Sequence, residues 1–446
     1  MPLLLVCLAL GALSLLTPSA PTYDPYSWIV WGREILELDL NTLEGPSWKP
    51  LPVILTTPFS LAGSDVAPQL WLVVARAGGL LALAMTFRLS SRLAGPAAGL
   101  IAATGLTLAD EFVRNAMLGN SEPLLVGLVL LAIERHLDDR PTHAFALGTA
   151  AALMRPELWP FWGLYGLWLA RDAPPRRRAA IAAAGATVLT LWFVPEWIGS
   201  GNPLRAADRA LEPNLDSAAF AERPALEVLR QASLILMIPI LVGAGLALLA
   251  TRRPSAARSA ERTLVVALGA AAAALLLVVA LMTEAGFAGN LRYVALPAAL
   301  VCVLAGAGWA GLIRAVADTR AGRAGAALVA VAVAALSIGS FEAPRLALAE
   351  DLREAREEAI LYDDLSNAIA LVGGRRAIDR CGGIYTGRFE VPAVAWELHK
   401  HLEDVDVFAI PPGHAFAIRG IALSRDPRFP RVAASRRWGV GRNCGP

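Results

Sequence analysis

Long apolar segments separated by short charged ones make up most of the first 343 residues. A helix that crosses the hydrocarbon core of a bilayer needs about 20 residues, so we expect the shorter segments to be tilted or partly re-entrant. The segment 143–170 contains Arg155-Pro156-Glu157, and we interpret it as two short helices, which gives about eleven spans. The apolar segments lie near 3–18, 66–87, 94–109, 120–135, 143–170, 178–198, 229–250, 262–282, 293–315 and 324–341.

The basic residues of the connections predict which side of the membrane each connection faces. One side carries the basic clusters, and the positive-inside rule makes it cytoplasmic. These clusters lie at 88–92, 134–140, 171–178, 252–262 and 314–323. The segments expected outside are 19–65, 110–120, the break at Arg155, 199–228, 283–292 and the part after about residue 342. The pattern therefore predicts a multi-pass protein of the plasma (inner) membrane, with its C-terminal part on the extracytoplasmic side.

After residue 343 the pattern changes to that of a water-soluble domain. An amphipathic, charged helix is expected at 350–370 and a second helix near 394–402. Strand-like pieces lie at 377–378, 405–410, 415–423 and 431–440. We therefore divide the chain into a transmembrane domain, 1–343, and an extracytoplasmic α/β domain, 344–446, whose folded part of about 90 residues is large enough for a modest core. In an oxidising compartment Cys381 and Cys444 would form a disulfide.

Composition agrees with this class and excludes others. The chain has 446 residues, of which 56% are hydrophobic and 17% charged, as expected of an integral membrane protein. A net charge of +2 gives no indication of nucleic-acid binding. No CxxC or HxxxH spacing occurs, so no zinc site is expected, and His399 and His401 are interpreted as surface residues. The first apolar segment lacks a basic stretch before it and is interpreted as a transmembrane helix.

The loop 19–65 holds the most informative stretch, DPYSWIVWGREI followed by PSWKPLPV. Asp24-Pro25 predicts a helix start with Asp24 as the N-cap, and helical spacing gives Trp28 and Trp31 an apolar face suited to the bilayer interface. Only two of the 40 basic Lys and Arg residues are lysines, and one of them is Lys49. A compact ammonium group is a good ligand for phosphate. The alternative is an amphipathic surface helix with an ordinary capping Asp and a Lys that reaches out of the bilayer.

The order of Asp24, then Arg33-Glu34-Ile35, then Lys49-Pro50-Leu51 resembles the first extracytoplasmic loop of GT-C glycosyltransferases. This superfamily includes the lipid-A aminoarabinose transferases and the protein O-mannosyltransferases. The resemblance implies that Asp24 is the essential carboxylate and that Lys49 contacts the phosphate of a polyprenyl-phosphate sugar. The sequence departs from the pattern at Trp48, where the aminoarabinose enzymes have an acid, and at Pro25.

Further charged residues are expected at the outer ends of the helices, where charges usually face a cavity, pair with one another or bind a charged ligand. Arg292-Tyr293, in NLRYVALP, resembles a helix start in the same superfamily whose basic residue faces the donor phosphate. Glu122, in SEP, resembles the acidic position that opens the fourth helix, although it also fits a plain helix start. Arg33, Glu34, Arg114 and Arg155 complete the candidate binding residues. For each of them the alternative is an anchor at the membrane interface or, for Arg155, a local ion pair with Glu157.

The resemblance implies an inverting glycosyltransferase that moves a sugar from a polyprenyl-phosphate donor to a glycan, lipid or protein acceptor. Asp24 would take the proton of the acceptor hydroxyl, and Lys49 and Arg292 would neutralise the leaving phosphate. No metal ligand or cofactor is assigned, and a divalent cation between Asp24 and the phosphate is left open. The alternatives are a transporter or flippase, which would show inverted repeats that we do not find, and a non-catalytic scaffold that displays the C-terminal domain.

Overall fold

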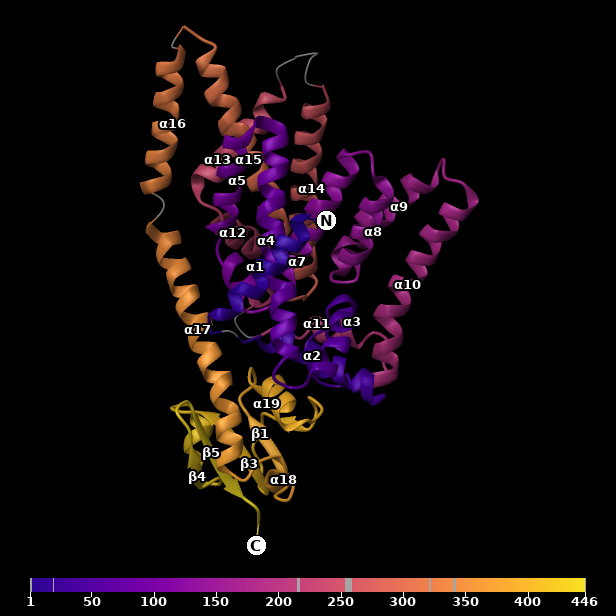
Figure 1. Cartoon of the computed structure of the whole chain (residues 1–446), viewed down its shortest axis with the longest axis vertical. Helices are drawn as coiled ribbons and strands as arrows, with labels where there is room; N and C mark the ends of the chain where they lie inside the picture. The colour runs from indigo at the N-terminus through magenta and orange to yellow at the C-terminus, as the bar shows by residue number, and fades with distance from the viewer. Residues whose placement is uncertain are drawn as a thin grey trace.

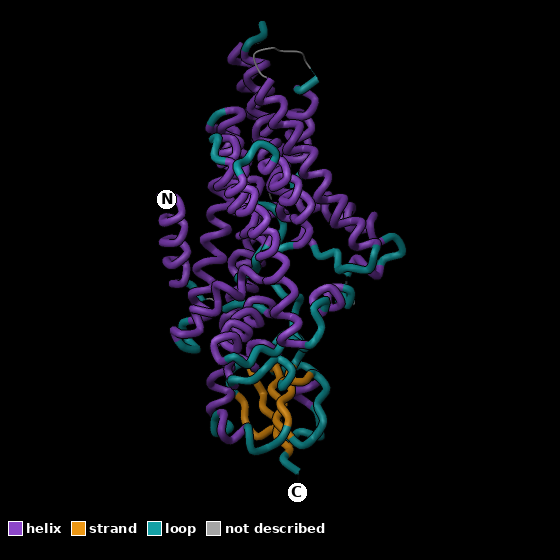
Figure 2. Tube along the Cα trace, turned by 90° about the vertical axis from the view of Figure 1, so that its right-hand side faces the viewer, coloured by secondary structure: helices purple, strands orange, loops and turns teal. Residues whose placement is uncertain are grey.

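The computed structural model describes residues 2–18, 20–214, 217–252, 259–320, 322–339 and 342–445, and the side chains of 333–347 lie outside this description. A helical bundle forms one end of the molecule and a small sheet the other (Figures 1 and 2). The helices of eight or more residues are α1 (Pro2–Leu13), α2 (Tyr23–Glu37), α3 (Pro50–Phe59), α4 (Ala67–Ala94), α5 (Pro96–Thr107), α7 (Glu122–Leu137), α8 (Pro141–Ala152), α9 (Trp159–Ala170), α10 (Pro175–Ser200), α12 (Pro224–Ile235), α13 (Ile238–Ala250), α14 (Ser259–Glu284), α15 (Ala295–Ala317), α16 (Gly322–Gly339), α17 (Glu342–Leu371) and α19 (Val391–Leu398).

The bundle is that of a multi-pass membrane protein. Among the described residues, four helices are long and apolar enough to cross a bilayer, namely α4, α10, α14 and the stretch Leu291–Ala317 that contains α15. A fifth span results if α12 and α13, which bend by 99° at a short break, are counted as one. Several of the expected spans are helices of only 12 residues, among them α5 and α9, so the number eleven stays a prediction. Part of the basic connection 252–262 lies outside the described residues.

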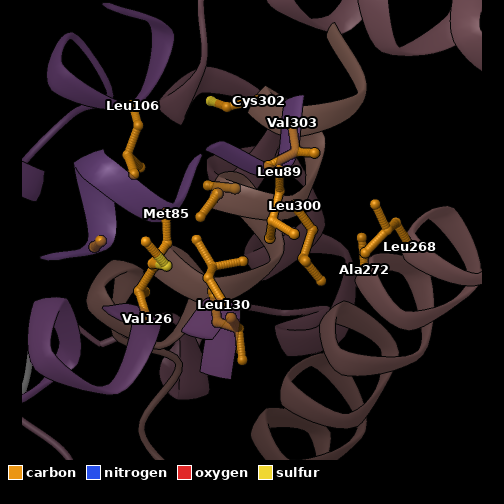
Figure 3. Packing of buried hydrophobic residues seen from close by; sticks show 14 of the residues in the cluster. Met85, Leu89, Leu106, Val126, Leu130, Leu268, Ala272, Leu300, Cys302 and Val303 are labelled. Carbon is orange, nitrogen blue, oxygen red and sulfur yellow. The ribbon is translucent and has the colours of Figure 1, made fainter. Parts of the chain in front are cut away.

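The centre of the bundle is held by close helix contacts and an apolar core. An ideal Cβ on Gly308 of α15 would lie 1.9 Å from the carbonyl oxygen of Gly243 on α13, so only glycine lets these backbones approach so closely. Figure 3 shows Met85, Leu130 and Val303, from α4, α7 and α15, packed together. This core fixes the ends of the three helices relative to one another.

The segment 143–170 forms the two short helices that the sequence predicted, α8 and α9. The break consists of Arg155 in an extended conformation and a 3-10 turn, η3 (Pro156–Leu158). A residue before proline avoids the helical region, so the helix has to end before Pro156. The break turns Arg155 away from the helix axis and toward the bundle.

Helix α2 corrects two expectations about the first loop. Its N-cap is Thr22, and Asp24 lies inside the first turn. Trp28 and Trp31 are fully buried within the protein, so the prediction of a helix lying in the bilayer interface is wrong. The reason is a tight contact with α3, where Gly32 lies against the backbone of Thr56. The apolar face that the spacing revealed is covered by protein.

The C-terminal sheet has the order β2-β1-β3-β5-β4, with β1 parallel to β2 and β3 and the other pairs antiparallel. Each of the expected segments 405–410, 415–423 and 431–440 contains a strand. The prediction of a strand at 377–378 is wrong, because these two residues end the short helix α18 (Arg375–Ile378). The sequence did not predict β1, whose four residues are too few to show alternation. Cys381 and Cys444 form a disulfide. The strands are β1 (Gly383–Thr386), β2 (Val405–Asp406), β3 (Gly413–Ile418), β4 (Arg431–Ala434) and β5 (Trp438–Asn443).

Candidate functional site

Five charged side chains from separate segments meet at one end of the helical bundle. We call them the charged cluster: Asp24, Lys49, Glu122, Arg155 and Arg292. They come from the first turn of α2, the residue before α3, the first turn of α7, the break between α8 and α9, and the 3-10 turn η6 (Leu291–Val294) before α15. Segments up to 268 residues apart in the chain thus place their charges together because the apolar core aligns the ends of the helices.

Glu122 is the centre of the charged cluster. Its Oε1 atom lies 3.3 Å from Lys49 Nζ and 3.9 Å from Arg292 Nε, and it accepts a hydrogen bond from Arg155. Glu122 is only 1% exposed, and its Oε2 has no hydrogen-bond partner among the described residues. A buried carboxylate with three cations around it is well compensated, and it leaves one oxygen able to accept a further hydrogen bond.

Asp24 is joined to the cluster through Arg292. Its Oδ2 atom lies 2.8 Å from Arg292 Nη2, and no other ion pair reaches Asp24 within the described part of the chain. The side chain of Arg292 keeps 22% of its surface exposed, more than the other two cations of the cluster. Tyr293 lies beside the cluster, its ring 3.9 Å from the guanidinium carbon of Arg155. Arg292 is therefore the most accessible member of the charged cluster, and Asp24 is buried beside it.

Lys49 is a buried cation held in one place. Its Nζ atom donates a hydrogen bond of 2.9 Å to Ser121 Oγ and lies 5.0 Å from the centre of the Trp28 ring. Burial lowers the pKa of Lys49 to about 8, and the charge of Arg155 acts in the same direction, while Glu122 opposes both. The ammonium form is thus disfavoured by its surroundings and would gain from a nearby anion.

Two cavities meet at the charged cluster and share Glu122 and Arg292 in their linings. The larger has Arg155 and Tyr293 at its polar end and apolar residues along its wall: Leu125, Leu158, Leu275, Val279 and Leu296. The smaller is also lined by Asp110 and Asn115. A lining that joins cations to apolar side chains suits a ligand with an anionic head and an apolar tail.

Three of the residues predicted for the site lie elsewhere. Arg33 donates a hydrogen bond of 2.6 Å to the carbonyl oxygen of Lys400 and stacks on Trp396 of α19. Glu34 contacts His401, and Arg114 pairs with Glu111 and with Glu354 of α17. Arg33 and Glu34 lie near the far end of α2 from Asp24, about 14 Å along the helix axis. These residues hold the C-terminal part against the bundle.

Sequence reasoning did not single out Arg205 and Glu196, two further buried charges that lie near Lys49. They come from α11 (Arg205–Ala210) and the end of α10, in a region without any recognised motif. Within the described residues, no group of three His, Cys, Asp or Glu side chains could hold a metal ion.

The contact between Glu34 and His401 predicts a pH-dependent stability. Burial raises the pKa of Glu34 to about 7, and the hydrogen bond to Glu34 raises the pKa of His401 although burial acts against it. Both groups hold protons more tightly when folded, so stability falls as the pH rises from 4.5 to about 7 for Glu34 and upward from 6.5 for His401. Between about pH 6 and 8 the Tm of the wild type should fall more than that of a Glu34→Gln/His401→Gln double variant.

The matched control for this measurement is the neighbouring pair Glu37 and His399, whose side chains are 44% and 52% exposed. A Glu37→Gln/His399→Gln variant should keep at least the fall in Tm of the wild type, because exposed pairs contribute little and the pKa of His399 is lowered by burial, which acts in the opposite direction to His401. Equal falls in Tm for the wild type and the Glu34→Gln/His401→Gln variant would contradict the assignment.

Comparison with known proteins identifies the fold that carries this site. No family model and no curated protein matches the chain. The solved structure of ArnT from Cupriavidus metallidurans bound to undecaprenyl phosphate is 16% identical and has a TM-score of 0.54, with 98% of this chain and 97% of that chain covered. Its apo structure gives the same values. An Archaeoglobus fulgidus oligosaccharyltransferase is 13% identical, with a TM-score of 0.46, over 91% of this chain and 63% of that chain. The chain therefore has the GT-C fold, as the motif in its first loop predicted.

Proposed function

We propose that this protein is an inverting glycosyltransferase that takes a sugar from a polyprenyl-phosphate donor and transfers it to an acceptor outside the cell membrane. The observation that carries the proposal is the charged cluster, in which Lys49, Arg155 and Arg292 converge beside an apolar cavity. The similar fold of an ArnT that binds undecaprenyl phosphate supports this class of donor.

The donor phosphate would lie among Lys49, Arg292 and Arg155, and the first isoprene units would follow the apolar side chains that line the larger cavity. Arg292 is the most exposed of the three cations, so it can meet the phosphate while Glu122 keeps all three in place. Negative charge grows on the phosphate oxygen as the sugar leaves, and preorganised cations stabilise that charge most when water is excluded. The free Oε2 of Glu122 can accept a hydrogen bond from a hydroxyl group of the sugar.

Asp24 would act as the general base. The acceptor oxygen attacks the anomeric carbon from the face opposite the phosphate, its bond to carbon forms as the carbon–phosphate oxygen bond breaks, and its proton passes to Asp24. One carboxylate and no covalent intermediate give inversion at the anomeric carbon. Arg292 Nη2 lies 2.8 Å from Asp24 Oδ2, and this ion pair would fix the orientation of the carboxylate for that step.

We place this site on the extracytoplasmic side of the plasma (inner) membrane. Two observations support the placement: the basic connections gather at the opposite ends of the helices, and the Cys381–Cys444 disulfide fits an oxidising compartment. The acceptor is a glycan, a lipid or a protein of the cell envelope. Transfer from radiolabelled polyprenyl-phosphate sugars in membranes that contain the wild-type protein tests the function directly.

Lys49→Ala is expected to weaken binding of undecaprenyl phosphate by about tenfold to a hundredfold, because a charge-assisted contact to phosphate contributes about 1.5–3 kcal/mol. Affinity can be measured with the purified protein in detergent. Lys400→Ala is the matched control, since Lys400 is the only other lysine and pairs with Asp379 far from the charged cluster. Equal affinities for Lys49→Ala and the wild type would rule out Lys49 as a phosphate ligand.

A further inference from the structure

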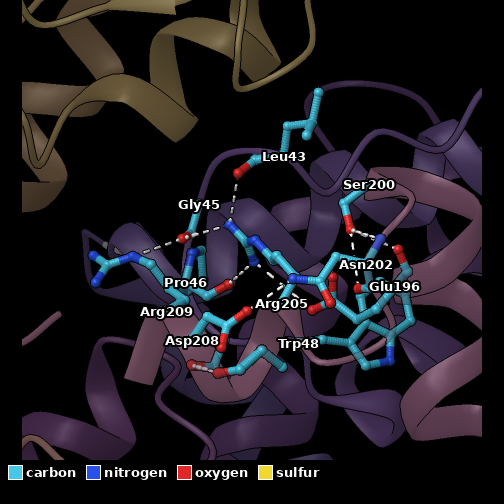
Figure 4. A network of polar contacts seen from close by, with 12 residues as sticks. Leu43, Gly45, Pro46, Trp48, Glu196, Ser200, Asn202, Arg205, Asp208 and Arg209 are labelled. Carbon is cyan, nitrogen blue, oxygen red and sulfur yellow. Dashed lines mark hydrogen bonds and ion pairs between the residues drawn. The ribbon is translucent and has the colours of Figure 1, made fainter. Parts of the chain in front are cut away.

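The segment 43–48, which leads directly into Lys49, contains neither helix nor strand. Its conformation must therefore come from contacts with other parts of the chain, because its own backbone hydrogen bonds cannot fix it. Figure 4 shows where these contacts come from: Arg205 of α11 points into the segment and reaches its carbonyl groups.

One guanidinium group binds three carbonyl oxygens of the segment. Arg205 Nη1 donates a hydrogen bond of 2.7 Å to Pro46, and Nη2 donates to Gly45 at 3.0 Å and to Leu43 at 3.3 Å. Arg205 is 8% exposed, so water competes little for these donors. The planar fork of arginine suits this task, whereas the single ammonium of lysine cannot reach three acceptors in this arrangement.

The guanidinium group of Arg205 is itself fixed by neighbouring side chains. Its Nη1 atom lies 3.8 Å from Glu196 Oε1, and Glu196 is fully buried in α10. The ring of Trp31 lies 5.9 Å from the guanidinium carbon on another side. A paired, buried guanidinium keeps one orientation, so the carbonyl groups that it binds are fixed as well.

The fixed segment transmits its position to Lys49. Trp48 donates a hydrogen bond of 2.9 Å to the carbonyl oxygen of Leu191 in α10, and Ser47 donates one of 2.9 Å to Ala206 in α11. Lys49 follows at once and is the N-cap of α3, whose first residue is Pro50. A shift of Pro46 or Trp48 therefore moves the backbone of Lys49 directly.

We propose that Arg205 is a positioning residue, which fixes the segment 43–48 and thereby keeps the Lys49 ammonium buried in the charged cluster. The inference rests on the proposed function only in taking Lys49 as the ligand of the donor phosphate. In Arg205→Gln the segment 43–48 loses its fixed conformation, and the side chain of Lys49 becomes more exposed to water.

The test follows the protonation of Lys49 itself. Burial lowers the pKa of Lys49 to about 8, among the charges of Arg155, Glu122, Arg292 and Asp24. A hydrated lysine has a pKa of about 10.4, so loosening moves the value upward. The chain has two lysines, so an amine-reactive reagent read by mass spectrometry reports Lys49 with Lys400 as the internal standard. The midpoint of the pH profile of Lys49 labelling should move from about 8 upward by at least about one unit in Arg205→Gln.

Two further variants keep this test decisive. Arg209→Gln removes the next arginine of α11, which contacts Gly45 alone in the segment, and should shift the midpoint much less. Glu196→Gln removes the charged partner of Arg205 and should shift the midpoint of Lys49 labelling in the same direction. This variant tests the proposal even if Arg205→Gln does not fold. Unfolded protein is recognised because Lys49 and Lys400 then give the same profile. An unchanged midpoint in Arg205→Gln and Glu196→Gln overturns the proposal, as do equal shifts in Arg205→Gln and Arg209→Gln.

The labelling experiment needs no sugar donor, so it tests the positioning role of Arg205 separately from the proposed role of Lys49 in phosphate binding. A shifted midpoint in Arg205→Gln together with normal lipid binding by Lys49→Ala means that the positioning is right and the proposed function of Lys49 is wrong. An unshifted midpoint together with lost binding by Lys49→Ala means the reverse.

Discussion

Asp24→Asn is expected to reduce sugar transfer by about 10²–10⁴-fold, because the amide cannot accept the proton of the acceptor hydroxyl. The amide has nearly the same shape as the carboxylate, so the helix start and the contact with Arg292 Nη2 can persist. Release of Arg292 from its negative partner should leave the affinity for undecaprenyl phosphate unchanged or raise it. Single-turnover transfer and lipid binding, measured on the same purified variant, separate these two effects.

Asp39→Asn is the matched control for this substitution. Asp39 lies in the same loop, its side chain is 75% exposed, and among the described residues it forms an ion pair only with His401 of the C-terminal part. This variant should transfer sugar at the wild-type rate. If Asp24→Asn transfers within about tenfold of the wild type, Asp24 is not the general base.

The members of the charged cluster could be predicted from the sequence because they are charged residues at the ends of apolar segments or in a recognisable motif. Asp24 and Lys49 belong to a recognisable motif, and Arg155 and Arg292 are charges at the ends of apolar segments, where an isolated charge is costly. Glu122 follows the same logic at the start of α7. Sequence alone did not reveal that Glu122 holds three cations together, since the contacts join residues between 33 and 170 positions apart.

Arg33 and Glu34 show where this reasoning fails. The spacing within α2 places Arg33 on the side opposite Trp28 and Trp31 and predicts that it faces water or a polar cavity. Arg33 is instead buried against the C-terminal part. The partner of Glu34 is His401, which is 367 residues away. Burial of both faces of α2 by protein is a tertiary effect, and an amphipathic period describes only the helix that carries it.

Arg205 lay beyond any sequence prediction for a different reason. It recognises carbonyl oxygens, which every residue has, so no side chain in the segment 43–48 marks the contact. The same holds for Trp48, whose indole donates to the carbonyl group of Leu191. Contacts of this kind leave no pattern in the residues they hold, and only the folded chain shows them.

Helix α2 therefore has two different ends. Its first turn gives Asp24 to the charged cluster, and its last turns give Arg33 and Glu34 to the C-terminal domain. A rigid helix of 15 residues connects the two contacts.

Glu122→Ala is expected to destabilise the protein by about 3–5 kcal/mol, because it leaves buried cations without their shared partner. Lys49 and Arg155 are 6% and 8% exposed and cannot turn their charges to water without rearrangement of the bundle. The loss should appear as a lower Tm in detergent. Glu134→Ala is the matched control on the same helix, since Glu134 is 5% exposed but pairs with Arg88, whose side chain is 51% exposed and can reach water.

The same variant distinguishes a structural cluster from an anion-binding one. If the cations are arranged to receive a phosphate, undecaprenyl phosphate should raise the Tm of Glu122→Ala more than that of the wild type, because a ligand anion then replaces the missing carboxylate. Undecaprenol, which has the same chain without the phosphate, should stabilise both proteins equally. Equal stabilisation by the two lipids would mean that Glu122 only balances buried charge, and that the donor phosphate binds elsewhere.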